Sequence, residues 1–445
     1  MSRRRTLRLF GTDGVRGVVG QSLTTELAHK LGRSAANQII KKNNGCMVIG
    51  RDTRRSGPSL EQALIEGICS QGIDVDAIGV LPTPAVSYLV RNHKTDGGVV
   101  VSASHNPAEY NGIKFFDNRG IKLDESLENL IESSLDSYNS NYTKIGTSLN
   151  DIQAEDDYLE HLISCIDGDL SGLCIALDCA NGAAHKIAPR AFRELGAEVF
   201  CYNCQPDGLN INLECGSTHP QTLEDICKKE KVDVGFSFDG DADRVIAVDE
   251  NGNHVDGDFI MAICATELKK AGKLANNTIV TTVMTNLGFY IAMEKEEIKV
   301  LQAKVGDKYV LDEMLKNGAS LGGEQSGHII FNDYGPIGDG LITSIKLAEV
   351  MKRKQQPLSE LTKIMQRLPQ ILINVKVKDK HKLNGSQKIW KSVEEAEKHL
   401  HGRGRILVRP SGTESLVRVM IESDDHDHAE DLAGQVAEVV ESELG

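Results

Sequence analysis

One serine in this sequence occupies a position typical of an exposed nucleophile. Ser104 lies in the segment VVVSASHNPAEYNGIKFF, where an apolar run ends in a polar turn. His105 and Asn106 follow it directly, and Lys114 comes ten residues later. A serine hydroxyl alone is a weak nucleophile, so this interpretation requires a cation, a proton carrier and an anion site elsewhere in the chain.

The segment FDGDADR offers three carboxylates at alternating positions, Asp239, Asp241 and Asp243. Glycine and alanine between them let the backbone turn so that the side chains converge on one point. Oxygen ligands without histidine or thiolate favour Mg²⁺ over zinc or copper. A solvated acidic turn in a β-hairpin is the alternative. Apolar strand patterns on both sides, and Arg244 directly afterwards, favour the metal site.

The segment RPSGTES has the groups that a phosphate dianion requires. Arg409 supplies a guanidinium, Ser411 and Thr413 supply hydroxyls, and the backbone around Gly412 supplies N–H donors. An ordinary β-turn with an exposed arginine explains this motif equally well. Arg418 is a weaker addition, because it also fits the polar face of a strand.

A third polar loop, GGEQSGH, places Glu324, Ser326 and His328 at alternating positions. In an extended backbone all three would point the same way. A carboxylate and a hydroxyl on one face suit neighbouring sugar hydroxyls, and a histidine there could pass a proton. The alternative for this loop is a polar turn with a structural histidine. Lys114 could act as a general acid or base, or supply only positive charge for a phosphate. A surface position is the alternative for Lys114. Arg16, in the glycine-rich GTDGVRG, is weak evidence alone.

Length and charge limit the possible functions. A chain of 445 residues is expected to form three or four domains, which leaves room for a cleft between them. The net charge of −14 gives no general reason to bind nucleic acid or an anionic membrane. No secretory signal or membrane-spanning run is recognisable, so we expect a soluble cytoplasmic protein.

Ten cysteines are scattered through the chain, mostly within apolar runs. Buried thiols are the expected interpretation. Cys201 and Cys204 form a lone C-x-x-C without a second pair at zinc-finger spacing, which disfavours zinc or redox use.

Helix and strand patterns alternate through most of the chain, which predicts α/β layers with mixed, mostly parallel sheets. We expect three similar α/β domains and a C-terminal α+β lid around one central cleft. The predicted domains are 1–150 with the serine loop, 151–256 with the acidic loop, 257–368 with the GGEQSGH loop, and 369–445 as a phosphate-binding lid.

Taken together and in this order, GTDGVRG, SASHNP with NGIK, DGDADR, GEQSGH and RPSGTE resemble the α-D-phosphohexomutase superfamily across essentially the whole chain. Within it, FGTDGVRG, VMTNLG, KVGDKYV and GGEQSGHI are most similar to the bacterial branch that acts on glucosamine phosphates. The resemblance implies four domains and a Mg²⁺-dependent interconversion of glucosamine 6-phosphate and glucosamine 1-phosphate, on the route to UDP-N-acetylglucosamine.

The resemblance also assigns roles to the matching residues. It implies that Ser104 carries the phosphate and passes through a glucosamine 1,6-bisphosphate intermediate. One Mg²⁺ per subunit would be bound by the phosphate of Ser104 and by Asp239, Asp241 and Asp243. The other implied roles are catalysis by Arg16, Lys114 and His328, and substrate binding by Arg244, Glu324, Ser326, Arg409, Ser411, Gly412 and Thr413.

Two residues depart from the superfamily pattern. Lys308 stands where arginine is usual in VGDRYV, and Gln302 stands where a basic residue is frequent. Lysine keeps the charge but loses the planar two-point contact, so a phosphate or interdomain contact there is in question. We expect a small hexosamine phosphate as the partner, no nucleic acid or membrane, and a monomer or homodimer.

The sequence leaves three rival functions open. A phosphomannomutase or phosphoglucomutase of the same superfamily differs only in its sugar. An aspartyl-phosphate phosphatase would carry phosphate on Asp239. A sugar-phosphate sensor would bind without turnover, and the intact set of serine, aspartates and lysine argues against it.

Overall fold

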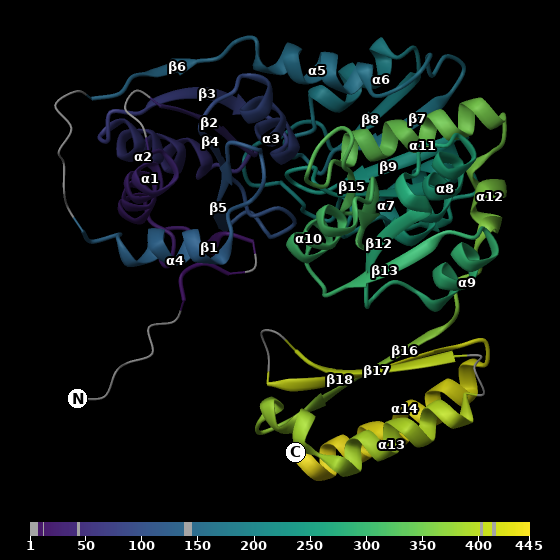
Figure 1. Ribbon diagram of the computed structural model, residues 1–445. Helices are drawn as coiled ribbons and strands as arrows, with labels where there is room; N and C mark the ends of the chain where they lie inside the picture. Colours follow the sequence, from purple (N-terminus) through teal and green to yellow (C-terminus); the bar gives the residue numbers. More distant parts are fainter. Residues whose placement is uncertain (1–7, 12, 42–44, 138–144, 401–403, 412–414) are drawn as a thin grey trace, which may run out of the picture. The chain divides into compact units, whose positions relative to one another are not determined.

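The structure, a computed structural model, describes residues 8–11, 13–41, 45–137, 145–400, 404–411 and 415–445. The chain forms two compact units. The first consists of Met1–Met284 with Glu297–Ile364, and the second of Thr285–Glu296 with Met365–Gly445. Within the described residues the first unit contains three sheets and the second unit one (Figure 1).

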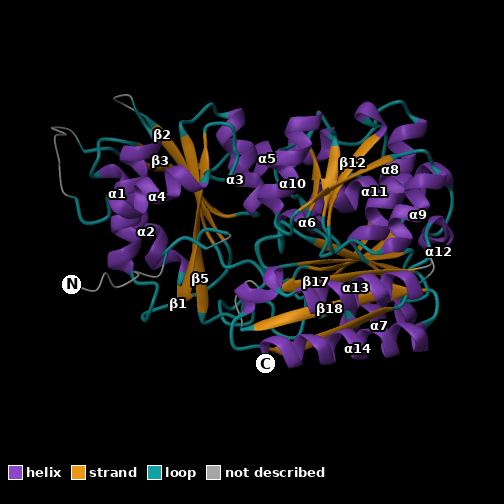
Figure 2. Cartoon of the chain, turned by 60° about the horizontal axis from the view of Figure 1, so that its bottom comes forward, coloured by secondary structure: helices purple, strands orange, loops and turns teal. Residues whose placement is uncertain are grey.

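The first sheet has the strand order β1-β5-β4-β2-β3-β6. Its strands are β1 Val15–Val18, β2 Cys46–Arg51, β3 Asp74–Val80, β4 Gly97–Val101, β5 Tyr110–Asp117 and β6 Ser148–Asn150. Its helices are α1 Thr25–Ile39, α2 Gly57–Cys69, α3 Thr83–Asn92 and α4 Glu125–Ser133. Figure 2 shows α1, α2 and α4 on one side of this sheet and α3 on the other. Central strand β4 is therefore buried on both faces, as its uninterrupted apolar sequence predicts.

The serine loop joins two neighbouring strands of this sheet. β4 runs parallel to β2 and antiparallel to β5, so residues 102–109 form the connection at one end of the sheet. Lys114 lies on β5 opposite Val100 of β4. The pairing therefore brings Lys114 back alongside the loop that contains Ser104.

The second sheet, of order β11-β10-β9-β7-β8, presents the acidic loop. Its strands are β7 Cys174–Asp178, β8 Glu198–Tyr202, β9 Val234–Phe238, β10 Val245–Asp249 and β11 His254–Val255. Its helices are α5 Ala154–Ser164, α6 Ile187–Glu194 and α7 Gln221–Glu230. β9 and β10 are fully buried and antiparallel, which confirms the prediction of two apolar strands around the acidic loop.

The third sheet, of order β13-β12-β14-β15, carries the GGEQSGH loop between β14 and β15. Its strands are β12 Thr278–Thr282, β13 Lys299–Ala303, β14 Leu321–Gly323 and β15 Ile329–Phe331. Its helices are α8 Gly257–Lys270, α10 Asp307–Asn317, α11 Gly340–Lys354 and α12 Leu358–Leu361. Parallel and antiparallel pairs occur in all three sheets of this unit, so the sheets are mixed as expected.

The second unit contains an antiparallel sheet of order β16-β18-β17, and Figure 1 shows helices α13 and α14 together on one face of it. Its elements are α9 Leu287–Lys295, β16 Gln370–Lys376, α13 Gln387–His399, β17 Gly404–Pro410, β18 Leu416–Ser423 and α14 His426–Leu444. The segment containing α9 joins this unit through Glu422, a fully buried carboxylate of β18. Glu422 accepts hydrogen bonds from the backbone N–H of Leu287 at 2.8 Å and from Arg405 at 2.7 Å.

None of the helices in the described part of the chain combines the length and apolarity that crossing a bilayer requires. All ten cysteines are free thiols.

Aromatic packing joins the first and second sheet regions at α3 and α5. Tyr88 of α3 stacks on His161 of α5, with ring centroids 4.0 Å apart. Tyr158, one turn earlier on α5, is fully buried and donates a hydrogen bond of 2.7 Å to Asp339. Burial and the nearby Arg91 lower the pKa of His161 to about 4, so the ring is neutral in this contact.

This contact predicts a loss of stability in mild acid. In the unfolded chain His161 becomes protonated below a pH of about 6.5. In the folded chain it stays neutral until the pH falls to about 4. The contribution is therefore complete above 6.5 and falls as the pH drops, by roughly 1–2 kcal/mol between pH 7 and pH 5. His161→Phe keeps a stacked ring, and its melting temperature should fall less over this range in calorimetry. Equal pH slopes for the two proteins would contradict the assignment.

Candidate active site

Ser104 has a strained backbone and a buried hydroxyl. Its φ of 52° lies in the left-handed region, which costs a non-glycine residue about 1–2 kcal/mol. The residue is 1% exposed, and its Oγ donates to Asp239 at 2.5 Å. Such conformations persist where the surroundings hold them, and they are frequent at active sites.

The three loop aspartates converge as the sequence predicts. One ligand oxygen from each of Asp239, Asp241 and Asp243 lies within 4.8 Å of the others, and all three residues are buried. Burial, followed by the charges of Asp243 and Asp241, raises the pKa of Asp239 well above its usual range. The loop therefore concentrates negative charge that needs a counter-ion.

The donor set fits a hard divalent cation such as Mg²⁺. Among the described residues, Asp241 Oδ1 and Asp243 Oδ1 are buried oxygens with no hydrogen-bond partner. Thr83, at the start of α3, fixes the loop by donating its hydroxyl to Asp241 Oδ2 at 2.7 Å and its N–H to the Asp241 carbonyl at 2.9 Å. These two carboxylate oxygens therefore remain available for a cation, and Arg244 Nε lies 3.8 Å from the one on Asp243.

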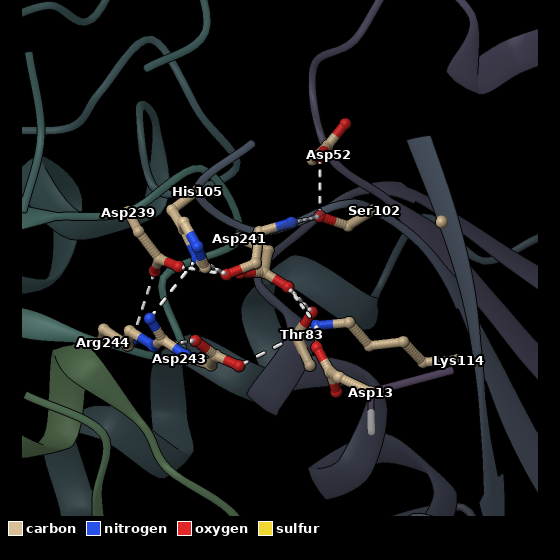
Figure 3. A network of polar contacts seen from close by, with 12 residues as sticks. Asp13, Asp52, Thr83, Ser102, His105, Lys114, Asp239, Asp241, Asp243 and Arg244 are labelled. Carbon is tan, nitrogen blue, oxygen red and sulfur yellow. Dashed lines mark hydrogen bonds and ion pairs between the residues drawn. The ribbon is translucent and has the colours of Figure 1, made fainter. Parts of the chain in front are cut away.

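Lys114 is buried, so the surface position considered from the sequence is wrong. The residue is 1% exposed, and its Nζ lies 2.9 Å from Asp241 Oδ2 and 3.0 Å from Asp13 Oδ2. Burial alone would lower the pKa of Lys114, but these carboxylates outweigh it and raise the pKa. The group is an ammonium ion directed at the metal loop (Figure 3).

Ionisable side chains from all three sheet regions form a closed ring beside the acidic loop, in which carboxylates alternate with lysine or histidine. Lys114 lies 3.9 Å from Asp243, His328 Nδ1 lies 3.6 Å from Asp243, and His328 Nε2 lies 3.8 Å from Asp307. Lys122 bridges Asp307 and Asp13, and Asp13 returns to Lys114. In order the ring is Asp13, Lys114, Asp243, His328, Asp307 and Lys122.

His328 is a buried member of this ring rather than an isolated structural histidine. Burial alone would lower the pKa of His328, but the carboxylates of Asp243 and Asp307 raise it. Its Nε2 also accepts a hydrogen bond of 3.1 Å from the Gly338 N–H. The imidazole is therefore oriented from two sides.

A second group of cationic side chains lies beside the serine loop. Arg16 donates to Asn106 Oδ1 at 3.1 Å and also pairs with Asp13. Arg244 NH1 lies 3.4 Å from His105 Nδ1, which in turn lies 3.3 Å from Ser104 Oγ. Burial, then the charges of Arg244 and Arg16, lowers the pKa of His105 to about 4, so this ring is neutral.

The GGEQSGH segment is a tight turn, so the expectation of an extended backbone is wrong. The Glu324 N–H donates to the His328 carbonyl at 2.9 Å, and Gly327 has a φ of 90°. A Cβ on Gly327 would lie 2.1 Å from the Val245 carbonyl of β10, so this turn requires glycine. Ser326 is exposed, whereas Glu324 Oε1 accepts a hydrogen bond of 3.0 Å from the Gly306 N–H.

A cavity of about 570 Å³ opens at this cluster. This volume is typical of small-molecule sites. Lys308 also lines it, and the Lys308 Nζ lies 3.5 Å from the Leu123 carbonyl, so lysine here makes an interdomain contact. Gln302 lies on β13 and is exposed. The lining includes the predicted residues Arg16, Lys114, Asp243, Arg244, Glu324 and His328.

The RPSGTES motif lies in the second unit. Arg409 of β17 is directly opposite Arg418 of β18, and burial followed by that charge lowers the pKa of Arg409. Ser411 is buried, and its carbonyl accepts a hydrogen bond of 2.6 Å from Lys380 Nζ. Gly412 and Thr413 lie outside the described residues.

Sequence reasoning missed Asp13, Lys122, Asp307 and Thr83. Each is a common residue type at an unremarkable position. Their contacts join distant parts of the chain: Lys122 pairs with Asp13, and Thr83 binds Asp241, each more than 100 residues away in sequence. Asp13 lies within GTDGVRG, which is the one local signal available.

The acidic loop predicts a specific effect of removing one charge. Asp241→Asn should weaken Mg²⁺ binding at least about tenfold, because one ligand loses its charge. Titration calorimetry of Mg²⁺ on the purified protein measures this without reference to activity. Asp249→Asn, which changes a carboxylate at the far end of the same hairpin, should bind Mg²⁺ as the unmodified protein does. Unchanged affinity in Asp241→Asn would exclude the loop as the metal site.

Four family models match consecutive parts of the chain. They are described as phosphoglucomutase/phosphomannomutase alpha/beta/alpha domain I at residues 7–142, domain II at 156–252, domain III at 256–368, and the C-terminal domain at 372–439.

Curated relatives and solved structures are similar over nearly the full length. Phosphoglucosamine mutases of Clostridium acetobutylicum and Clostridium novyi are 50% and 51% identical, with 98% of this chain and 99% and 98% of theirs covered. A phosphoglucomutase/phosphomannomutase family protein of Burkholderia thailandensis has a TM-score of 0.83 at 24% identity, covering 98% of this chain and 97% of that one. Aspergillus fumigatus N-acetylphosphoglucosamine mutase, in complex with GlcNAc-6P and magnesium, has a TM-score of 0.68 at 18% identity, covering 98% and 96%.

Proposed function

The chain belongs to the bacterial phosphoglucosamine mutases of the phosphoglucomutase/phosphomannomutase family, and on that premise we propose that it interconverts glucosamine 6-phosphate and glucosamine 1-phosphate. The observation that carries the proposal is the contact between the Ser104 hydroxyl and Asp239 of the acidic loop, at 2.5 Å. It joins the candidate nucleophile to the candidate metal site, and cationic side chains surround both.

The cycle starts with a phosphate ester on Ser104. An oxygen of the sugar attacks the phosphorus, the bond from phosphorus to Oγ breaks, and the proton of the attacking hydroxyl passes to a protein group. The product is glucosamine 1,6-bisphosphate, which turns over and returns its other phosphate to Ser104. Phosphoryl transfer of this kind depends mainly on in-line positioning and on neutralising spread negative charge.

The residues of the cavity divide these tasks. Arg16, Arg244 and Lys114 supply positive charge around the phosphoryl oxygens. Lys114 and His328 carry protons, and Lys114 starts in the charged form, suited to stabilising the departing Oγ. Glu324 and Ser326 bind sugar hydroxyls.

Mg²⁺, bound by Asp239, Asp241, Asp243 and the phosphate of Ser104, would supply further neutralisation of the transferring group. In the C-terminal unit, the opposed Arg409 and Arg418 support a site for the phosphate that is not reacting, together with Ser411, Gly412 and Thr413.

We assign the four tasks to the domains predicted from the sequence. Residues 1–150 provide the phosphoserine, 151–256 the metal loop, 257–368 the sugar contacts and 369–445 the distal phosphate site. Ten free thiols fit a reducing compartment, so we place the reaction in the cytoplasm.

Removal of the nucleophile is the central test. Ser104→Ala should abolish turnover while the protein still folds and binds sugar phosphate, because only the phosphate acceptor is lost. The matched control is Ser87→Ala, which removes another buried serine hydroxyl of the same domain and should remain active. Mass spectrometry should locate the phosphate on Ser104 in the active enzyme. Normal activity in Ser104→Ala, or phosphate on Asp239, would refute the mechanism.

The sugar is tested by comparing turnover of glucosamine 6-phosphate, glucose 6-phosphate and mannose 6-phosphate. We expect the highest kcat/KM with glucosamine 6-phosphate. A higher value with either neutral sugar would reassign the enzyme within its family.

A further inference from the structure

Hydrogen bonds hold both peptide groups that flank the Cα of Ser104. On one side, the Ser104 N–H donates to Ser102 Oγ at 3.0 Å, and Ser102 Oγ donates to Asp52 Oδ2 at 2.7 Å. On the other side, the Ser104 carbonyl accepts from Arg54 NH2 at 3.0 Å. Asp52 and Arg54 are themselves paired at 2.8 Å. The Asp52–Arg54 ion pair therefore fixes both the N–H and the carbonyl of Ser104, the N–H through Ser102.

Arg54 is fully buried, and all five of its N–H donors are used. Both members of the pair have 0% exposed side chains. Arg54 Nε donates to Asp52, and NH1 and NH2 donate to four backbone carbonyls, those of Ser104, Asn106, Pro107 and Tyr110. The planar guanidinium has five N–H donors, one for each of these five acceptors. Lysine has three donors on a single nitrogen and cannot reach all five.

A second clamp reaches the same carbonyls from the domain of the acidic loop. Asn212 Nδ2 donates to the Ser104 carbonyl at 2.9 Å and to the Asn106 carbonyl at 3.1 Å. Gly240, between two of the loop aspartates, packs so closely that an added Cβ would lie 2.6 Å from the Ser104 carbonyl. The turn is therefore held by two domains at once.

We propose that Arg54 and Asn212 are positioning residues for phosphoryl transfer, which together hold Ser104 in its left-handed conformation against the acidic loop. This inference rests on the proposed function of Ser104. Neither residue lines the cavity, so both act through the serine turn and not on the sugar. Because an in-line transfer is sensitive to displacements of about 1 Å, loosening the turn reduces the rate of transfer more than substrate binding.

The test measures phosphoryl transfer onto Ser104 directly. Enzyme stripped of phosphate is mixed with ³²P-labelled glucosamine 1,6-bisphosphate, and the single-turnover labelling rate, kcat, KM and melting temperature are recorded. Arg54→Lys should slow labelling about 100-fold while KM changes less than about threefold. Asn212→Asp, which keeps the size and tolerates the φ of 58° but turns an oxygen towards the carbonyls, should slow it about tenfold.

A matched control separates positioning from general stability. Arg51, three residues earlier, pairs with Glu61 at 2.9 Å and donates to the Asp52 carbonyl at 3.4 Å, and its side chain has no hydrogen bond to residues 102–110 in the described structure. Arg51→Lys should keep the labelling rate within about twofold even where its melting temperature falls. The double variant of Arg54 and Asn212 should lose less than the product of the single effects, because both donors act on the same two carbonyls.

Labelling of Ser104 at the unmodified rate in Arg54→Lys, or an equal loss in Arg51→Lys, would overturn this inference alone. Labelling of the unmodified enzyme at a residue other than Ser104 would overturn the proposed function and this inference with it. If Arg54→Lys does not fold, Asn212→Asp decides: an unchanged labelling rate refutes the positioning role, and a slower rate with unchanged KM supports it.

Discussion

Repulsion among three buried carboxylates is the constraint on which the rest of the site depends. Two unit charges 4 Å apart interact by about 4 kcal/mol in a partly screened protein environment, so a loop with Asp239, Asp241 and Asp243 within 4.8 Å requires compensation. Lys114 of the first domain supplies part of it, and His328 of the third domain lies 3.6 Å from Asp243. The remaining charge is an electrostatic reason to bind a divalent cation.

The same compensation links domains that are far apart in sequence. Lys114 lies within 4 Å of three carboxylates and Lys122 pairs with two, so removing either lysine leaves an unbalanced buried charge. Lys122 illustrates this, because it alone bridges Asp13 of the first domain and Asp307 of the third among the described residues. Catalytic geometry and domain cohesion are therefore produced by the same side chains.

The sequence predicts the elements of this site better than their connections. The apolar runs before Ser104 and around Asp241 were sufficient to predict the strands, because buried strands have uninterrupted apolar sequences. The turn at Gly327 was missed, since its cause is the Val245 carbonyl of another domain. Arg54 was missed because an arginine after a strand is typically exposed, and only the fold brings four carbonyls to it.

The C-terminal unit is discontinuous in sequence, and this affects the order of synthesis. Residues Thr285–Glu296 leave the ribosome before β16, β17 and β18 have been translated, although they belong to the same unit. Until then the backbone N–H of Leu287 lacks Glu422, its later partner. Completion of this unit therefore waits until β18 has been translated, and a fragment that begins at Met365 would lack the segment that covers its buried glutamate.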